Sequence, residues 1–157
     1  MTPLGLRFIR DIGNRLDPRL LRITAGRLSS VWPFPAVLVT HTGARSGRTR
    51  TSALVYFTDR GRIILIATNF GAQRNPSWYY NMKVNTKVEV YGHRLQGRFV
   101  AEEILGAERD RLFQRAADAP GPYGKYRAVA REKNRYVPVL ALTPESSSRA
   151  HNRIDLR

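Results

Sequence analysis

The fold is decided by one stretch, Val37-Leu-Val-Thr-His-Thr-Gly-Ala-Arg-Ser-Gly-Arg-Thr-Arg-Thr51. Apolar residues 37–39 predict a β-strand, and a second apolar run at residues 53–57 follows the polar residues between them. The glycines of this polar loop let a ligand approach the backbone closely, and its hydroxyl, amide and guanidinium groups can bind phosphate or carboxylate. The loop is therefore either an anion-binding cradle between two strands or a solvated basic hairpin.

Turn signals divide the rest of the chain into short strands and helices. Runs that are apolar or rich in β-branched residues predict six strands, at residues 37–39, 53–58, 62–67, 87–91, 94–103 and 136–142. Helical patterns cover residues 106–117 and 123–132, and Asn75-Pro76 starts a shorter helix with Asn75 as its cap. The sequence therefore predicts a mainly β domain, an antiparallel core with helices added in its C-terminal half.

The two ends of the chain differ from this middle part. Residues 1–35 form a basic segment with helical spacing of its apolar residues, and residues 145–157 form a polar tail. Residues 36–144 would then be the barrel, within one domain overall. The N-terminal segment either covers the core of the domain or makes peripheral contact with a membrane surface. We favour the first interpretation.

Composition restricts the partners and the chemistry. A net charge of +15 over 157 residues implies an acidic partner. The absence of cysteine excludes thiol chemistry, and the scattered His41, His93 and His151 predict no metal site. The basic residues are spread along the chain and no nucleic-acid motif is present, so a nucleic-acid partner is not expected. No signal peptide or apolar run of about 20 residues is visible, which predicts a cytoplasmic protein, with the inner face of the plasma membrane as an alternative.

Three motifs resemble the deazaflavin-dependent nitroreductase family, whose members have a split β-barrel like that of flavin reductases. The family pattern Thr-Gly-x-(Lys/Arg)-(Ser/Thr)-Gly-x-x-Arg is matched by Thr42, Gly43, Arg45, Ser46, Gly47 and Arg50. The second motif is Asn75-Pro-Ser-Trp-Tyr-Tyr-Asn-Met-Lys-Val-Asn85, and the third is the pair Tyr123 and Tyr126. The resemblance extends from about Val37 to Pro144 and implies a split barrel of about six antiparallel strands.

The resemblance implies coenzyme F-420 as cofactor, with FMN as the alternative. Coenzyme F-420 is an 8-hydroxy-5-deazaflavin whose tail carries a phosphodiester and glutamates. By resemblance, Arg45, Ser46 and Arg50 hold the phosphate, and Arg48 faces the glutamate carboxylates. Positions near the ring or tail are Val55, Tyr56, Ala67, Thr68, Asn69 and Trp78. Core packing is the alternative role for Trp78, and His41 is interpreted as structural or as a minor anion contact.

The predicted function is oxidoreduction, in which hydride passes from reduced F-420 to a quinone, an enone or a nitro compound. Tyr123 and Tyr126 are the candidate catalytic residues, because a phenol can hydrogen-bond an acceptor oxygen; packing on the barrel is the alternative. Pro120 stands where some members have a further tyrosine, which argues against activity on nitroimidazoles. A non-catalytic carrier of F-420, flavin or lipid is the alternative function. Exposed edge strands are compatible with a homodimer.

Overall fold

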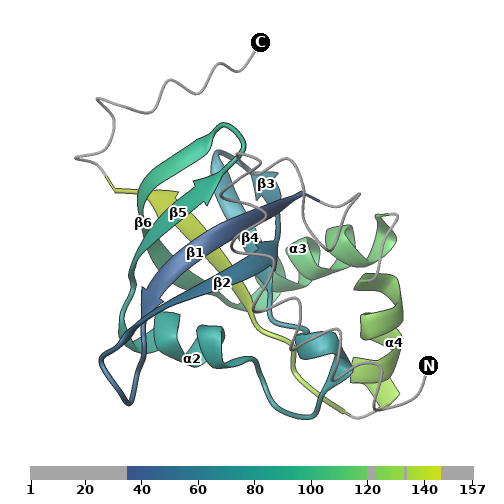
Figure 1. The fold of residues 1–157 in the computed structure, drawn as a ribbon. Helices are drawn as coiled ribbons and strands as arrows, with labels where there is room; N and C mark the ends of the chain where they lie inside the picture. The colour runs from purple at the N-terminus through teal and green to yellow at the C-terminus, as the bar shows by residue number, and fades with distance from the viewer. Residues whose placement is uncertain (1–34, 120–122, 133, 146–157) are drawn as a thin grey trace.

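The computed structural model describes residues 35–119, 123–132 and 134–145 (Figure 1). The expectations for the N-terminal segment 1–35 and the tail 145–157 lie outside these residues, apart from Pro35 and Glu145. Within the described part, no helix is long and apolar enough to span a lipid bilayer. Almost all of the region 36–144, in which the sequence places the barrel, belongs to the described part.

Seven strands form a single sheet in the order β2-β1-β5-β6-β7-β4-β3, and every neighbouring pair is antiparallel. The strands are β1 (Ala36–Thr42), β2 (Thr49–Val55), β3 (Phe57–Asp59), β4 (Arg62–Ile66), β5 (Lys87–Gly92), β6 (Leu95–Ile104) and β7 (Val139–Pro144). The predicted mainly β fold is confirmed, with one strand more than the six expected. The additional strand arises because the run 53–58 is divided at Tyr56 between β2 and β3.

β2 and β3 are the two edges of this sheet, although only Tyr56 separates them along the chain. β2 pairs with β1 alone and β3 pairs with β4 alone. The sheet must therefore curl until its two edges meet at Tyr56, as the natural twist of strands allows. Beyond that point the edges are not hydrogen-bonded to each other, so the barrel is left open along β2.

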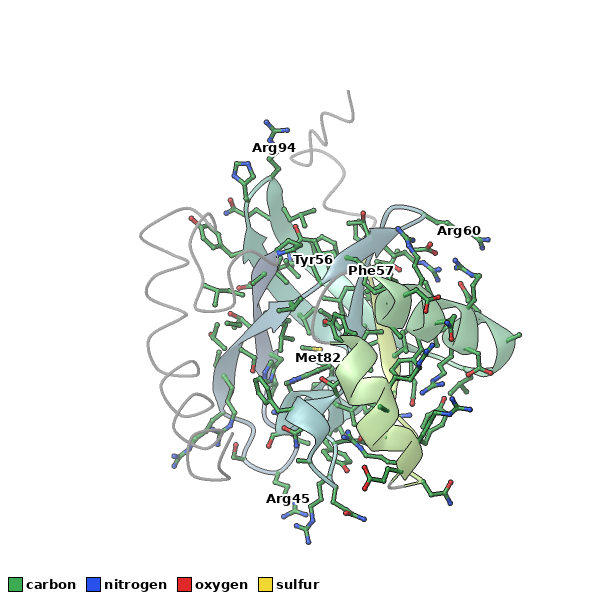
Figure 2. All side chains as sticks on the ribbon, turned by 90° about the vertical axis from the view of Figure 1, so that its right-hand side faces the viewer. Arg45, Tyr56, Phe57, Arg60, Met82 and Arg94 are labelled. Carbon is green, nitrogen blue, oxygen red and sulfur yellow. The ribbon has the colours of Figure 1, made fainter. Side chains whose placement is uncertain are left out.

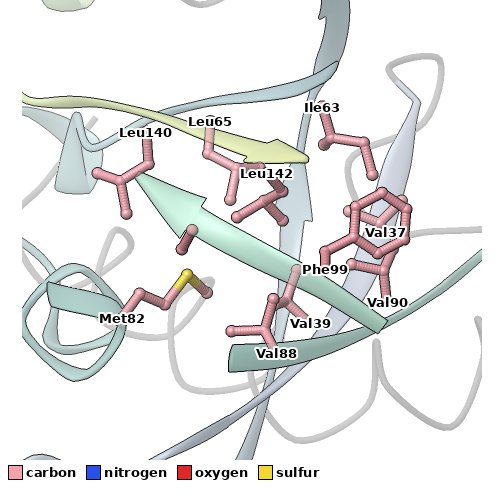
Figure 3. Packing of buried hydrophobic residues seen from close by; sticks show 11 residues of the cluster. Val37, Val39, Ile63, Leu65, Met82, Val88, Val90, Phe99, Leu140 and Leu142 are labelled. Atoms are coloured by element: carbon pink, nitrogen blue, oxygen red, sulfur yellow. The ribbon is translucent and has the colours of Figure 1, made fainter. Parts of the chain in front are cut away.

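The side chains of β4 are buried on both faces of the sheet. Ile63 and Leu65 belong to the interior cluster of the barrel, whereas Ile64 and Ile66 belong to a second cluster beneath α3 (Gly106–Asp118) and α4 (Tyr123–Glu132). Burial on both sides explains why this strand is apolar without alternation. The interior cluster (Figure 3) also contains Val37, Val39, Met82, Val88, Val90, Phe99, Ala101, Leu140 and Leu142. Each large side chain buried there stabilises the fold by roughly 1.5–3 kcal/mol.

The short helix α2 (Ser77–Val84) closes one end of the barrel and places Met82 in the interior cluster (Figures 1 and 2). The predicted cap was wrong. No side chain caps α2, because the amide oxygen of Asn75 accepts a hydrogen bond from Arg135. The last strand was predicted three residues too early: Pro138 precedes β7, and its carbonyl accepts a hydrogen bond from the Ala67 amide.

Candidate functional site

The loop between β1 and β2 is a tight hairpin connection that requires glycine at two positions. The Gly43 amide donates to the Arg48 carbonyl, and the Gly47 amide donates to the Gly43 carbonyl, both at 2.9 Å. A Cβ atom at Gly43 would lie 2.6 Å from Ser46 Oγ, so a larger residue would collide inside the loop. Gly47 has φ +63°, which favours glycine. The loop is shorter than predicted, because β1 extends to Thr42 and β2 begins at Thr49.

Two backbone amides of this loop are open. The Ala44 amide donates to Asn81 Oδ1 at 2.9 Å, and the Arg48 amide donates to Ser46 Oγ at 3.3 Å. In the part of the chain that the structure describes, the amides of Arg45 and Ser46 have no acceptor. Two consecutive open amides are suited to binding one anion. Thr42 is among the residues that line a pocket of about 270 Å³, with Thr40, Thr49, Lys87, Glu89 and Arg98. Its predicted contact with the cofactor stays a prediction.

The arginines of the loop carry uncompensated charge. Among the described residues, Arg45, Arg48 and Arg50 have no carboxylate partner, and all three are exposed. Arg45 points away from the barrel (Figure 2). The Arg50 side chain passes beside Gly43, with its Nε 3.4 Å from the position that a Cβ on Gly43 would take. Free guanidinium groups beside open amides fit an anionic group of a ligand.

The helix α2 supports the loop from the interior side. Asn81 Nδ2 lies 3.3 Å from His41 Nδ1, and His41 Nε2 lies 3.1 Å from Ser52 Oγ. Asn85 Nδ2 donates to the Thr42 carbonyl at 3.3 Å. Burial, and then the charge of Arg50, lower the pKa of His41 below its ordinary value. Sequence analysis gave Asn81 and Asn85 no role, although asparagines four apart on a helix share one face.

A second irregular segment, residues 67–75, follows β4. Asn69, Phe70 and Gly71 have φ of +47°, +52° and +77°, so three consecutive residues are left-handed. Such a backbone is strained at the two residues that are not glycine, by about 1–3 kcal/mol each. Ala67 and Thr68 are buried, and the Asn69 side chain donates to the Arg74 carbonyl at 2.7 Å.

Arg135 holds this segment in place. Its guanidinium group donates to the carbonyls of Thr68, Ala72 and Ala67 at 2.7, 2.6 and 2.8 Å, and to Asn75 Oδ1 at 2.8 Å. Burial lowers the pKa of Arg135 from its usual value. Four charge-assisted hydrogen bonds offset the strain of the left-handed residues. Sequence analysis missed Arg135, because no sequence pattern marks backbone carbonyls as partners.

The remaining predicted ring positions lie in two places: Val55 ends β2 and is followed by Tyr56, whereas Trp78 belongs to α2. Tyr56 is half-buried against the interior cluster, and burial raises the pKa of its phenol. Trp78, in the first turn of α2, packs against the same cluster. Val55 lies five positions after Arg50 along β2, which corresponds to about 17 Å. The structure therefore gathers the basic loop and α2, and places Tyr56 a strand's length away.

The two candidate catalytic tyrosines both lie on α4. Tyr123 packs against the second cluster, and its hydroxyl donates to the Val55 carbonyl at 3.4 Å. The side chain of Tyr126 is outside the described part of the chain. The catalytic role of these residues stays a prediction. Within the described residues, no group of three or more His, Asp or Glu side chains could hold a metal ion.

A different arginine cluster surrounds Asp59, at the end of β3. Arg111 donates to both carboxylate oxygens at 3.3 and 2.8 Å, Arg115 donates at 2.7 Å, and Arg62 donates at 3.5 Å. The hydrogen bonds from Arg111, followed by the charges of Arg111, Arg115 and Arg60, lower the pKa of Asp59 to about 2 against the opposing effect of burial. Arg62 also pairs with Glu108 on α3 at 2.7 Å. This cluster fastens α3 to the hairpin of β3 and β4.

The sequence and the fold are similar to those of known proteins. The model of the F-420H(2)-dependent quinone reductase family matches residues 14–144. The chain belongs to this family. The F-420H(2)-dependent quinone reductase Rv1261c of Mycobacterium tuberculosis is 29% identical over 133 residues, 82% of this chain and 88% of that protein.

Two solved structures are similar to the fold. An F-420-H2 dependent reductase has a TM-score of 0.59 and 34% identity over 69% of this chain and 93% of its own. A structure described as a domain-swapped dimer has a TM-score of 0.60 and 30% identity over 82% of this chain and 96% of its own. The family expected from the sequence, its split barrel, the dependence on F-420 and an oxidoreductase activity are confirmed.

Proposed function

We propose that the chain reduces a quinone, an enone or a nitro compound, with the tail of F-420 on the loop Gly43–Arg48 and its ring beside Tyr56. Reduced F-420, when bound, supplies the hydride. The observation that carries the proposal is the set of unpaired loop arginines beside the open amides of Arg45 and Ser46. A tail with a phosphodiester and glutamates has the anionic groups that this loop lacks.

In this proposal, side chains of the protein bind the tail of the cofactor and orient its ring. Arg45, Arg50 and Ser46 hold the phosphate, and Arg48 faces the glutamates. Each charge-assisted contact contributes about 1.5–3 kcal/mol. The distance of about 17 Å along β2 suits a long cofactor whose anionic tail and ring are far apart. Val55, Tyr56, Trp78 and residues 67–69 then line the ring, and Arg135 holds the carbonyls of Ala67 and Thr68 in place.

Tyr123 and Tyr126 are the proposed contacts of the acceptor. A phenol on α4 would orient the acceptor oxygen and give it a proton as hydride arrives. The hydrogen bond from Tyr123 to the Val55 carbonyl brings this helix to the end of β2 that adjoins Tyr56. That contact supports a place for α4 above the ring, and it leaves Tyr126 as the second candidate on the same helix.

Two measurements test the proposal. Fluorescence titration should show tighter binding of F-420 than of FMN, and equal or reversed affinities would remove the cofactor assignment to this loop. Reduced F-420 should then be oxidised by a menadione-like quinone, followed at about 420 nm, the wavelength for which the cofactor is named. If no quinone, enone or nitroaromatic compound is reduced, the protein is a cofactor carrier rather than an enzyme.

The assembly and the location of the protein are further proposals. The unpaired edges of β2 and β3, together with the relative described as a domain-swapped dimer, support a homodimer, which light scattering after gel filtration would test. The division into a basic segment 1–35, a barrel 36–144 and a polar tail 145–157 is tested by limited proteolysis. A cytoplasmic location with peripheral membrane contact rests on the net charge of +15 and on the sequence of residues 1–35, and cell fractionation would test it.

A further inference from the structure

The two sides of α2 bind different parts of the barrel. On one side, Tyr79 donates from its hydroxyl to the Glu103 carboxylate at 3.2 Å, and Lys83 pairs with the same carboxylate. On the other side, Asn81 and Asn85 bind the end of β1 and the loop that follows it. The first side attaches the helix to β6. The second side reaches the backbone that precedes the open amides.

The hydrogen bonds of Asn81 determine which atoms of Asn81 and His41 donate and which accept. Its Oδ1 accepts from the Ala44 amide, so its Nδ2 is the group that faces His41 Nδ1. An amide nitrogen can only donate, and His41 Nδ1 must therefore be unprotonated. The proton of the neutral imidazole is then on Nε2, which donates to Ser52 Oγ. Both Asn81 and His41 are buried, at 8% and 4% exposure, so each of these bonds is expensive to lose.

This chain of bonds decides which amides of the loop face outward. The Ala44 amide points inward to Asn81, and the Gly43 amide is used within the loop. The next two amides, of Arg45 and Ser46, are the open pair. If the Asn81 side chain were absent, the Ala44 amide would lose this acceptor. The turn could then rotate, and the amides of Arg45 and Ser46 would no longer both face outward.

We propose that Asn81 and neutral His41 are positioning residues of the anion-binding loop, which orient the amides of Arg45 and Ser46 toward the phosphate of F-420. Asn85 acts as a second clamp through the Thr42 carbonyl. The inference rests on the proposed function, because it assigns this loop to the tail of F-420. It also accounts for Asn81 in α2 and for Asn85 directly after the helix, both of which bind the end of β1 or the loop.

The test compares two ligands and two sides of one helix. Asn81→Ala should weaken binding of F-420 about tenfold, the effect of one misplaced hydrogen-bonding group. Binding of 8-hydroxy-5-deazariboflavin, which has the ring but no phosphate, should change less than about twofold, because the phosphate contact is absent. Tyr79→Phe is the matched control, since it removes a hydrogen bond from the opposite side of α2. It should change neither affinity, although both variants lower the melting temperature.

Each outcome separates this inference from the proposed function. Equal weakening for both ligands, or the same loss in Tyr79→Phe, would overturn the positioning role of Asn81. If Arg50→Ala also leaves the affinity for F-420 unchanged, the loop does not bind the tail, and the proposed site itself is wrong. If Asn81→Ala does not fold, Asn85→Ala provides the decision. It should weaken binding of F-420 about threefold and spare the phosphate-free ligand, and equal affinity for F-420 would overturn the proposal.

Discussion

The structure holds two groups of arginines that look alike in the sequence and differ in their surroundings. The loop arginines, Arg45, Arg48 and Arg50, have no carboxylate partner among the described residues. The hairpin arginines, Arg62, Arg111 and Arg115, converge on the buried carboxylate of Asp59. The positive charge of the first group is available to a ligand, whereas that of the second group is balanced by a carboxylate within the protein.

This difference shows that the net charge of +15 does not by itself locate a binding site. A cation whose charge is balanced by a buried carboxylate stabilises the fold and attracts an anion weakly. A cation without such a partner keeps its attraction, which is strongest beside open amides. The site is therefore marked by arginines that lack a partner, and the following predictions test that criterion.

The largest expected effect is on stability, from Asp59→Asn. The change leaves three guanidinium groups facing an uncharged amide, and the loss of charge-assisted hydrogen bonds at a buried carboxylate costs about 3 kcal/mol. Urea denaturation should show that decrease in the free energy of unfolding. Fluorescence titration should show an unchanged affinity for F-420 in the folded protein. A stability equal to that of the wild type would mean that Asp59 does not stabilise the fold through Arg62, Arg111 and Arg115. The proposed difference between these arginines and the loop arginines would then be wrong.

Arg50→Ala should have the opposite pattern. Removal of a charge-assisted contact should weaken the affinity for F-420 by about 1.5–3 kcal/mol, while the free energy of unfolding changes little because Arg50 has no carboxylate partner among the described residues. Titration and urea denaturation of the same variant give both values. A collapse of the melting temperature with unchanged affinity in the folded fraction would show that Arg50 is structural.

The sequence was sufficient where the signal is local. The largely apolar run 62–67 predicted a strand, and the pattern of residues 106–117 predicted a helix, because these requirements act on neighbouring residues. It was insufficient where the signal is tertiary. Nothing in the run 53–58 marks Tyr56 as the point at which the chain leaves β1 and joins β4, since both halves favour strand equally.

The same limit applies to the candidate site. The family resemblance indicated the basic loop, but neither Asn81 nor Arg135 was recognised as its support or as the support of residues 67–75. Arg135 binds carbonyls more than 60 residues away, and any residue supplies a carbonyl. Asp59 gave no signal of its three partners either, because Arg111 and Arg115 read as the solvated face of a helix.

The two regions should also lose stability in different ranges of pH. The pKa of Asp59 is lowered from 3.8 to about 2, so its stabilisation is present above pH 3.8 and is lost as the pH falls toward 2. The pKa of His41 is lowered from 6.5, so the unfolded chain binds a proton more readily and stability decreases as the pH falls below 6.5. Melting temperatures between pH 8 and 2 should show both decreases.

Single substitutions assign those two decreases. His41→Gln should remove the decrease below pH 6.5 and keep the acidic one. Asp59→Asn should remove the acidic decrease and keep the one below pH 6.5. A profile that both variants leave unchanged would mean that neither group is linked to folding, and the hydrogen-bond network from Ala44 to Ser52 would lose its requirement for a neutral imidazole.

The smallest effect is expected from Tyr123→Phe. This variant tests whether α4 belongs to the binding site or to the structural part of the protein. Tyr123 packs against the second cluster, as does Phe57, whose ring lies under Arg115, so its packing is like that of the structural group although we propose it as a contact of the acceptor. Its hydrogen bond to the Val55 carbonyl is 3.4 Å long, and its removal should cost at most about 1 kcal/mol of stability. The affinity for F-420 should not change.

If the hydroxyl only joins α4 to β2, the rate of quinone reduction should also stay near that of the wild type. A fall in that rate of about 10²–10⁴ would instead show general acid catalysis by Tyr123 and would place α4 in the reaction. Tyr126→Phe, measured in parallel, decides whether that role belongs to the neighbouring phenol. A wild-type rate in both variants would remove the tyrosines from the mechanism and leave the contribution of the protein to the binding of cofactor and acceptor.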